Sequence, residues 1–88
     1  MLYKVLNIRD VGYDYPNSVY VGRPSDFGNP FSLKDNTRAQ AIAKFEALIY
    51  NNEDFYDLIM LELRRKNLLC WCSPEACHAD VLLRIANE

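Results

Sequence analysis

All three cysteines of the chain and its only histidine lie in one stretch, LLCWCSPEACHADVLL, at positions 68–83. The four residues are Cys70, Cys72, Cys77 and His78. Such a set is open to three kinds of chemistry: a zinc site, a reactive thiol with its base, or a turn that holds another ligand. Which of these applies depends on the elements that position the side chains.

A zinc site would use all four side chains, because zinc prefers sulfur and nitrogen ligands in a tetrahedral arrangement. The spacing Cys-x-Cys-x4-Cys-His is a weak match, since structural zinc sites commonly pair two Cys-x2-4-Cys units from separated parts of the chain. Adjacent Cys77 and His78 would both have to turn toward one ion, which a regular helix does not favour. Zinc remains an alternative, and the sequence leaves any other cofactor unknown.

A reactive thiol would be Cys77 or Cys72 near a helix N-terminus, where partial positive charge lowers a thiol pKa. His78 would then act as base or cation, and Asp80 as an acid or a hydroxyl-binding group beside it. The candidate catalytic residues are therefore His78, Cys77 and Asp80. In the third interpretation the cysteines are small buried apolar residues, and His78 holds the turn or faces a ligand pocket.

A second unusual stretch, VYVGRPSDFGNPF, occupies positions 19–31. Glycines there let the backbone approach a ligand, and Arg23 carries a forked donor that suits phosphate or carboxylate. Asn29 precedes a proline, which favours an extended backbone and leaves its amide free to bind. The alternative is a connector pinned by its prolines and Phe31, with Arg23 in a structural salt bridge. The candidate ligand-binding residues are Gly22, Arg23, Pro24, Ser25, Gly28, Asn29 and, from the first stretch, Cys72.

The rest of the chain predicts the elements that position these two stretches. Apolar patterns indicate strands over 3–8, 18–22 and 68–72, and helices over 37–50, 51–67 and from 73 onward. The order is β-β-α-α-β-α. This order predicts a single small α/β domain over residues 1–88, with a sheet of about three strands and helices packed on it. We expect a hairpin between the first two strands and a buried central position for the third.

Local signals define the helix ends. Thr37 with Gln40 matches a capping box, and Asn52 can cap the next helix. Ser73 and Pro74 match the N-cap and first residue of the last helix. The basic residues expected in the last turn of the second helix are Arg64, Arg65 and Lys66.

Composition limits the classes of function. The formal charge of the 88 residues is −2, which gives no general basic surface for nucleic acid. No apolar run reaches the roughly 18 residues that span a membrane, and the stretch MLYKVLNIRD lacks the apolar core of a signal peptide. Three closely spaced cysteines make a poor disulfide framework and fit a reducing compartment. The sequence therefore predicts a cytoplasmic protein with no membrane partner.

The two stretches together resemble the small bacterial and phage proteins of domain of unknown function family 4326. That family carries Val-Gly-Arg-Pro-Ser and Gly-Asn-Pro-Phe early, then Cys-Trp-Cys, Pro, Cys-His and Asp late. The resemblance runs from about Val19 to Asn87, with departures at Phe27 and Ala79, where tryptophan and glycine are expected. The matching positions are Val21, Gly22, Arg23, Pro24, Ser25, Gly28, Asn29, Pro30 and Phe31, then Cys70, Trp71, Cys72, Pro74, Cys77, His78 and Asp80.

The resemblance implies a phage origin, and hence a location in the host cytoplasm, but no function. A more distant similarity to domain of unknown function family 488 implies only an α/β fold.

Ligand sites in α/β domains lie beyond the carboxyl ends of the strands. Gly22 and Cys72 each end a predicted strand, so neighbouring strand ends would bring the two stretches together. We expect a small-ligand-binding domain that recognises or processes a small anionic ligand such as a nucleotide or nucleoside-sugar. Arg23 would hold phosphate, Asn29 would contact a polar edge, and His78 would face the reacting or ribose end. The alternatives are a phage-type interaction module that binds a host protein through exposed tyrosines, without catalysis, or a zinc-stabilised structural domain.

Overall fold

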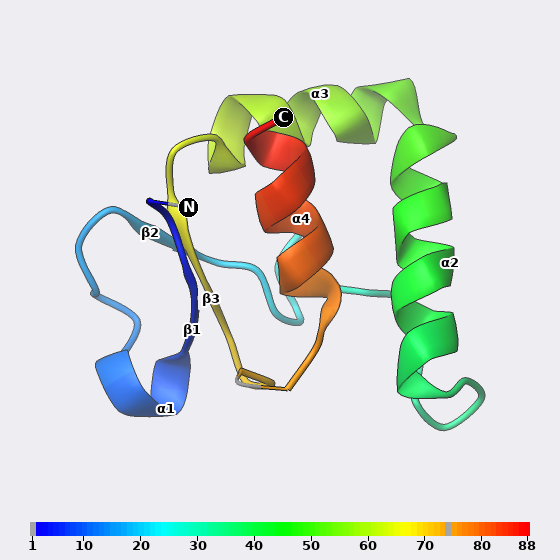
Figure 1. Cartoon of the computed structure of the whole chain (residues 1–88), viewed down its shortest axis with the longest axis horizontal. Coiled ribbons are helices and arrows are strands. Elements are labelled where there is room, and N and C mark those ends of the chain that lie inside the picture. The colour runs from blue at the N-terminus through cyan, green and yellow to red at the C-terminus, as the bar shows by residue number, and fades with distance from the viewer. Residues whose placement is uncertain (1, 74) are drawn as a thin grey trace.

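Three short parallel strands form the sheet in a computed structural model that describes residues 2–73 and 75–88 (Figure 1). They are β1 (Val5–Asn7), β2 (Ser18–Tyr20) and β3 (Asn67–Cys70). The strand order is β1-β3-β2, so the last strand in the chain lies in the middle. Leu68 is the register partner of Val5 on one side and of Val19 on the other. The α/β class, the three strands and the central position of the third are confirmed.

The expected hairpin between the first two strands is wrong. β1 and β2 each pair with β3 in parallel. β3 lies in the centre because it is the most apolar strand, and its residues Leu68, Leu69 and Cys70 are buried. The residues of the two edge strands are only half-buried. A short helix, α1 (Ile8–Val11), follows β1, so the first strand ends one residue before the predicted bound of 3–8.

The two predicted middle helices are confirmed with their N-caps. Helix α2 (Arg38–Tyr50) begins after Thr37, which forms the expected capping box with Gln40. Helix α3 (Glu53–Leu63) begins after Asn52, whose side chain accepts from the Phe55 N–H. The far end of α3 differs from the prediction, because the helix ends at Leu63 and Arg65 has a positive φ of 62°. Arg64, Arg65 and Lys66 therefore form the connection to β3.

The last helix, α4 (His78–Ala86), starts four residues later than predicted. Its N-cap is Cys77, whose sulfur accepts from the Ala79 N–H while the Asp80 carboxylate accepts from the Cys77 N–H. This reciprocal pair fixes the start of the helix, so Ser73 is not a cap and lies in the turn before it. Pro74, the expected first helical residue, lies outside the described residues.

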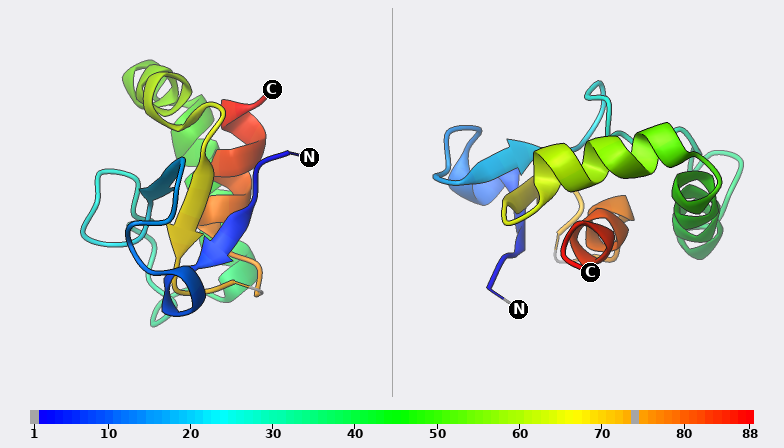
Figure 2. Two further views of the ribbon diagram at one scale, coloured as in Figure 1. Left: turned by 90° about the vertical axis from the view of Figure 1, so that its left-hand side faces the viewer. Right: turned by 90° about the horizontal axis from the view of Figure 1, so that it is seen from above.

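Helix α4 is the centre of the packing. It contacts β1 and β3 on one side and α2 and α3 on the other (Figures 1 and 2). Seven of its nine residues are buried. No helix in residues 2–73 and 75–88 has the length and apolar character needed to cross a membrane. The largest fully buried side chains are Phe45, Ile49, Ile59, Leu63, Leu68, Leu69, Leu82, Ile85, Val21 and Cys70.

Candidate functional site

The two unusual stretches of the sequence meet at a pocket of about 450 Å³. β2 and β3 are parallel neighbours, so the chain leaves both strands at the same edge of the sheet. The segment after β2 is called the Gly-Arg loop (residues 22–31), and the segment from the end of β3 to the start of α4 is called the Cys-His turn (residues 70–78). The predicted site residues that line the pocket are Gly22, Arg23, Asn29, Cys70, Cys72, Cys77 and His78.

Four predicted site residues lie outside this lining. Pro24 is exposed, and Ser25 accepts a hydrogen bond from the Phe27 N–H within the loop. At Gly28 an added Cβ would lie 3.1 Å from Arg23 Cγ, so the glycine makes room for the arginine stem. Asp80 is exposed on α4, where its carboxylate serves the capping box. The structure therefore gives these residues roles in the loop or the helix start.

Arg23 closes the Gly-Arg loop on itself. Its Nε and Nη2 donate to the Asn29 carbonyl over 2.9 and 2.6 Å. Two of the five guanidinium N–H donors are thereby used within the loop, and the others remain for a ligand. The structural salt bridge of the alternative interpretation is not formed by Arg23 in the described residues, and its place is taken by hydrogen bonds to a backbone carbonyl.

Asn29 is held by its own surroundings. Its Nδ2 donates to the Ala41 carbonyl on α2 over 3.2 Å, and its Oδ1 accepts from the Phe31 N–H over 2.9 Å. The expectation of an amide free to contact a ligand is therefore wrong. The side chain fixes the Gly-Arg loop against the first turn of α2.

Tyr20 joins the two walls of the pocket. Its hydroxyl donates to the Arg23 carbonyl over 2.8 Å and accepts from Trp71 Nε1 over 3.1 Å. The ring lies so close to the backbone that a Cβ on Gly22 would be 2.4 Å from the hydroxyl oxygen. Gly22 thus makes room for this tyrosine.

His78 is buried and its ring Nε2 lies 2.7 Å from the Val21 carbonyl oxygen. Because a carbonyl only accepts, Nε2 carries the hydrogen, and the neutral ring has Nδ1 as its acceptor. Burial lowers the pKa of His78, and the positive charge of Arg23 adds to this, against the opposing effects of the Val21 hydrogen bond and Asp80. The neutral imidazole is therefore the stable form at neutral pH.

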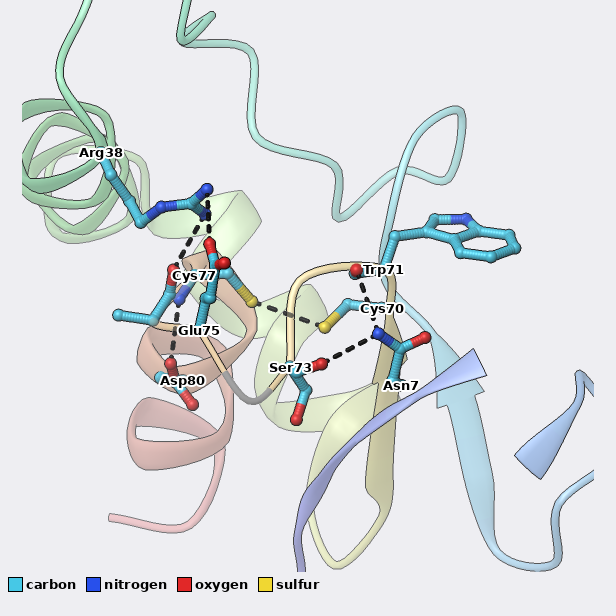
Figure 3. A network of polar contacts seen from close by, with 9 residues as sticks. Asn7, Arg38, Cys70, Trp71, Ser73, Glu75, Cys77 and Asp80 are labelled. Atoms are coloured by element: carbon cyan, nitrogen blue, oxygen red, sulfur yellow. Dashed lines mark hydrogen bonds and ion pairs between the residues drawn. The ribbon is translucent and has the colours of Figure 1, made fainter. Parts of the chain in front are cut away.

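Two of the three thiols form a close pair. Cys70 Sγ and Cys77 Sγ are 3.5 Å apart, and both residues are buried (Figure 3). A hydrogen bond from Cys77 lowers the pKa of the Cys70 thiol to about 6, with help from backbone N–H groups and against burial. The same hydrogen bond and burial raise the pKa of Cys77. Cys72 follows the strand end and is only half-buried.

The four-residue zinc arrangement is not formed. Among the described residues, no group of three or more His, Cys, Asp or Glu side chains is placed to hold a metal ion. His78 directs Nε2 to a carbonyl, and Cys77 serves as a helix cap.

Sequence reasoning missed two cations of the pocket, Lys34 and Arg38. Arg38 begins α2, forms an ion pair of 3.0 Å with Glu75 and donates to the Ala76 carbonyl over 3.2 Å (Figure 3). It thereby ties α2 to the Cys-His turn. Lys34 lies between the Gly-Arg loop and α2, and Arg38 is the first residue of α2. No local sequence pattern shows that this part of the chain reaches the pocket.

Asn7 was also missed. It pairs with Cys70 at the end of β1 and donates through Nδ2 to the carbonyls of Trp71 and Ser73, over 3.1 and 2.9 Å (Figure 3). This amide fixes the course of the Cys-His turn as it leaves the sheet. An asparagine at a strand end is the one signal that could have indicated it.

Residues 7–88 match the family model described as Domain of unknown function (DUF4326), so the chain belongs to this family. The match confirms the family indicated by the two stretches, and its description carries no activity. No curated protein and no solved structure matches the chain.

Proposed function

We propose that this domain binds a small anionic ligand of the nucleotide or nucleoside-sugar class in the pocket between the Gly-Arg loop and the Cys-His turn. The observation that carries the proposal is the charge of the lining. Arg23, Lys34 and Arg38 line the pocket, and none of its described lining residues is acidic. Arg38 is already paired with Glu75, so Arg23 and Lys34 supply the local excess of positive charge in a chain whose formal charge is −2. Such a pocket concentrates anions and holds phosphate oxygens.

Size and aromatic content favour a nucleotide over a bare inorganic anion. A volume of about 450 Å³ lies within the range of small-molecule sites. Trp71 is 50% exposed and lines the pocket together with Phe31. A base can stack on such rings while the phosphate reaches the cations. His78 lines the same pocket and offers an acceptor nitrogen to a ribose or sugar hydroxyl.

Binding is the function that the geometry supports best. Of the three candidate catalytic residues, Asp80 is engaged in the helix cap and lies outside the lining. Cys77 and His78 line the pocket. Hydrolysis or glycosyl transfer would therefore depend on these two residues, without a carboxylate partner.

The test is a fluorescence titration, because Trp71 is the single tryptophan of the chain. Nucleoside mono-, di- and triphosphates and nucleoside diphosphate sugars are added to the protein, with uncharged nucleosides as the matched control. We expect saturable quenching by at least one phosphorylated compound and none by its nucleoside. No spectral change and no thermal stabilisation by any phosphorylated compound would contradict the proposal.

The same titration separates this function from the interaction module. Tyr13 and Tyr15 are 61% and 41% exposed, whereas Tyr20 is engaged inside the pocket. The Tyr13 ring packs edge-on against Tyr20, with centroids 5.3 Å apart, so Tyr15 is the better control. Under the proposed function Tyr15→Ser leaves nucleotide affinity unchanged. A loss of affinity in this variant would place the ligand elsewhere.

A further inference from the structure

The Cys70–Cys77 pair has the geometry of a dithiol that can close. Cys70 is the last residue of β3 and Cys77 is the N-cap of α4, so both sulfurs sit at fixed element ends. Their separation of 3.5 Å has to shrink by roughly 1.5 Å to reach a disulfide bond. Cys72 lies in the turn beyond the strand, and only one residue separates it from Cys70. The pair is thus defined by the fold.

The pair is buried and yet reachable. Cys70 and Cys77 are 1% and 3% exposed, and both line the pocket. A small reagent can therefore approach the two cysteines through the pocket. Another protein is too large to enter it. Arg23, Lys34 and Arg38 lie along the same lining and favour a reagent with negative charge.

We propose that Cys70 and Cys77 are a redox-active dithiol that exchanges with low-molecular-weight disulfides carrying carboxylates. The pocket admits the reagent, and the product is a Cys70–Cys77 disulfide that joins the end of β3 to the start of α4. This activity uses the same pocket as the nucleotide and does not rest on nucleotide binding.

The exchange takes two balanced steps. The Cys70 thiolate attacks one sulfur of the small disulfide RS–SR, so that a Cys70–SR bond forms, the RS–SR bond breaks, and RS⁻ leaves and takes a proton from water. The Cys77 thiol then releases its proton to water and attacks Cys70 Sγ. The Cys70–Cys77 bond forms, and the second RS⁻ leaves and takes a proton from water. Two electrons pass from the protein to the reagent, which is reduced to two thiols.

The electrostatics of the pair suits these roles. The Cys77 hydrogen bond lowers the pKa of the Cys70 thiol, which favours Cys70 as the attacking thiolate. Cys77 keeps its proton until the mixed disulfide removes the negative charge beside it. Attack by Cys70 and resolution by Cys77 follow from this order.

The test equilibrates the reduced wild-type protein with oxidised glutathione in the absence of nucleotide, followed by alkylation and mass spectrometry. Cleavage after Trp71 and after Glu75 puts each cysteine on its own peptide. We expect the free thiols to fall from three to one, with Cys70 and Cys77 linked and Cys72 alkylated. A disulfide that includes Cys72, or three alkylated cysteines in the folded protein, would overturn the proposal.

Two variants sharpen the result. Cys72→Ser should form the same disulfide. Cys77→Ser keeps an oxygen acceptor at the N-cap and should stop at the first step, with glutathione bound to Cys70. Glutathione bound to Cys72 in that variant would overturn the assigned order. A failed nucleotide titration with an intact Cys70–Cys77 disulfide would leave this inference standing and remove only the proposed function.

Discussion

His78 on α4 and Val21 after β2 are joined by a hydrogen bond of 2.7 Å from the ring Nε2 to the backbone carbonyl. Val21 also donates its N–H to the Leu69 carbonyl over 2.9 Å, which continues the β2–β3 pairing. One residue thus connects the sheet, the Gly-Arg loop and α4. The relative position of the two pocket walls is set by this backbone and imidazole contact.

The first prediction concerns pH. Because burial lowers the pKa of His78 in the folded state, the unfolded state binds more protons below its ordinary pKa of about 6.5. The contribution of His78 to the free energy of unfolding should therefore be fully present above about pH 6.5 and should be lost as the pH falls below that value. Urea unfolding at pH values on both sides of it measures the change.

The control for this prediction is His78→Gln, whose amide can still donate to the Val21 carbonyl and does not titrate. Its unfolding free energy should lack the part of the slope that the histidine supplies. Equal slopes for both proteins would assign the pH dependence to groups other than His78.

Asp80 provides the second prediction. Its carboxylate accepts from the Cys77 N–H over 3.0 Å at the start of α4. Asp80→Ala should lower the free energy of unfolding by about 0.5–1 kcal/mol, because a cap hydrogen bond and a favourable charge at the helix start are lost. Thermal unfolding should show a drop of a few degrees, with nucleotide affinity unchanged. A loss of nucleotide affinity without a change in stability would contradict this and would indicate that Asp80 contacts the ligand.

The third prediction tests the contact between Gly22 and Tyr20. Gly22→Ala places a Cβ 2.4 Å from the tyrosine hydroxyl oxygen, so the ring must leave its hydrogen bonds to Arg23 and Trp71. We expect a loss of roughly 1–3 kcal/mol in the free energy of unfolding. In a Tyr20→Ala background the same change should cost much less. A double-mutant cycle by urea unfolding gives the coupling, and additive effects would contradict the contact.

Arg23 is the subject of the fourth prediction. Arg23→Ala removes two donors from the Asn29 carbonyl and should lower the free energy of unfolding by roughly 0.5–1.5 kcal/mol. Arg23→Lys should recover only part of this loss, because an ammonium lacks the planar fork. Full recovery by lysine would show that charge alone matters at this position. Chemical unfolding of the three proteins provides the comparison.

The fifth prediction concerns Lys34, which is exposed and lines the pocket. Lys34→Ala should weaken nucleotide binding roughly 3- to 10-fold with little change in stability, as expected for the loss of one exposed phosphate contact of about 1 kcal/mol. Lys4→Ala is the matched control, since Lys4 is exposed outside the pocket. Equal losses of affinity in both variants would show that binding depends on the net charge of the protein and not on Lys34 in the pocket.

Local signals predicted the parts of the fold that local interactions decide. Thr37 with Gln40 and Asn52 identified the starts of α2 and α3, because a cap satisfies backbone donors within one turn. The start of α4 was misplaced because Ser73 has the usual chemistry of a cap and Cys77 does not. The capping pair of Cys77 and Asp80 prevails in the folded chain.

Long-range features were harder to predict. Strand pairing depends on which apolar strand gains most from burial on both faces. The sequences of β1 and β2 alone therefore could not show that these strands pair with β3 and not with each other. For the site, the position of Gly22 and Cys72 at predicted strand ends indicated that they lie close together, and both line the pocket. It could not show that Arg23 bonds within the loop and that Asn29 bonds to the loop and to α2, because these contacts depend on the path of the loop.

The central position of β3 affects the order in which the chain can fold. Val5 pairs with Leu68 and Ser18 pairs with Asn67, so no strand pair of this sheet joins near neighbours in the sequence. During synthesis α2 and α3 can form while both edge strands still lack a partner. The sheet can assemble only after β3 (Asn67–Cys70) has left the ribosome. Such distant pairings slow folding relative to a helical bundle of equal length, and they make a truncated nascent chain a substrate for chaperones and proteases.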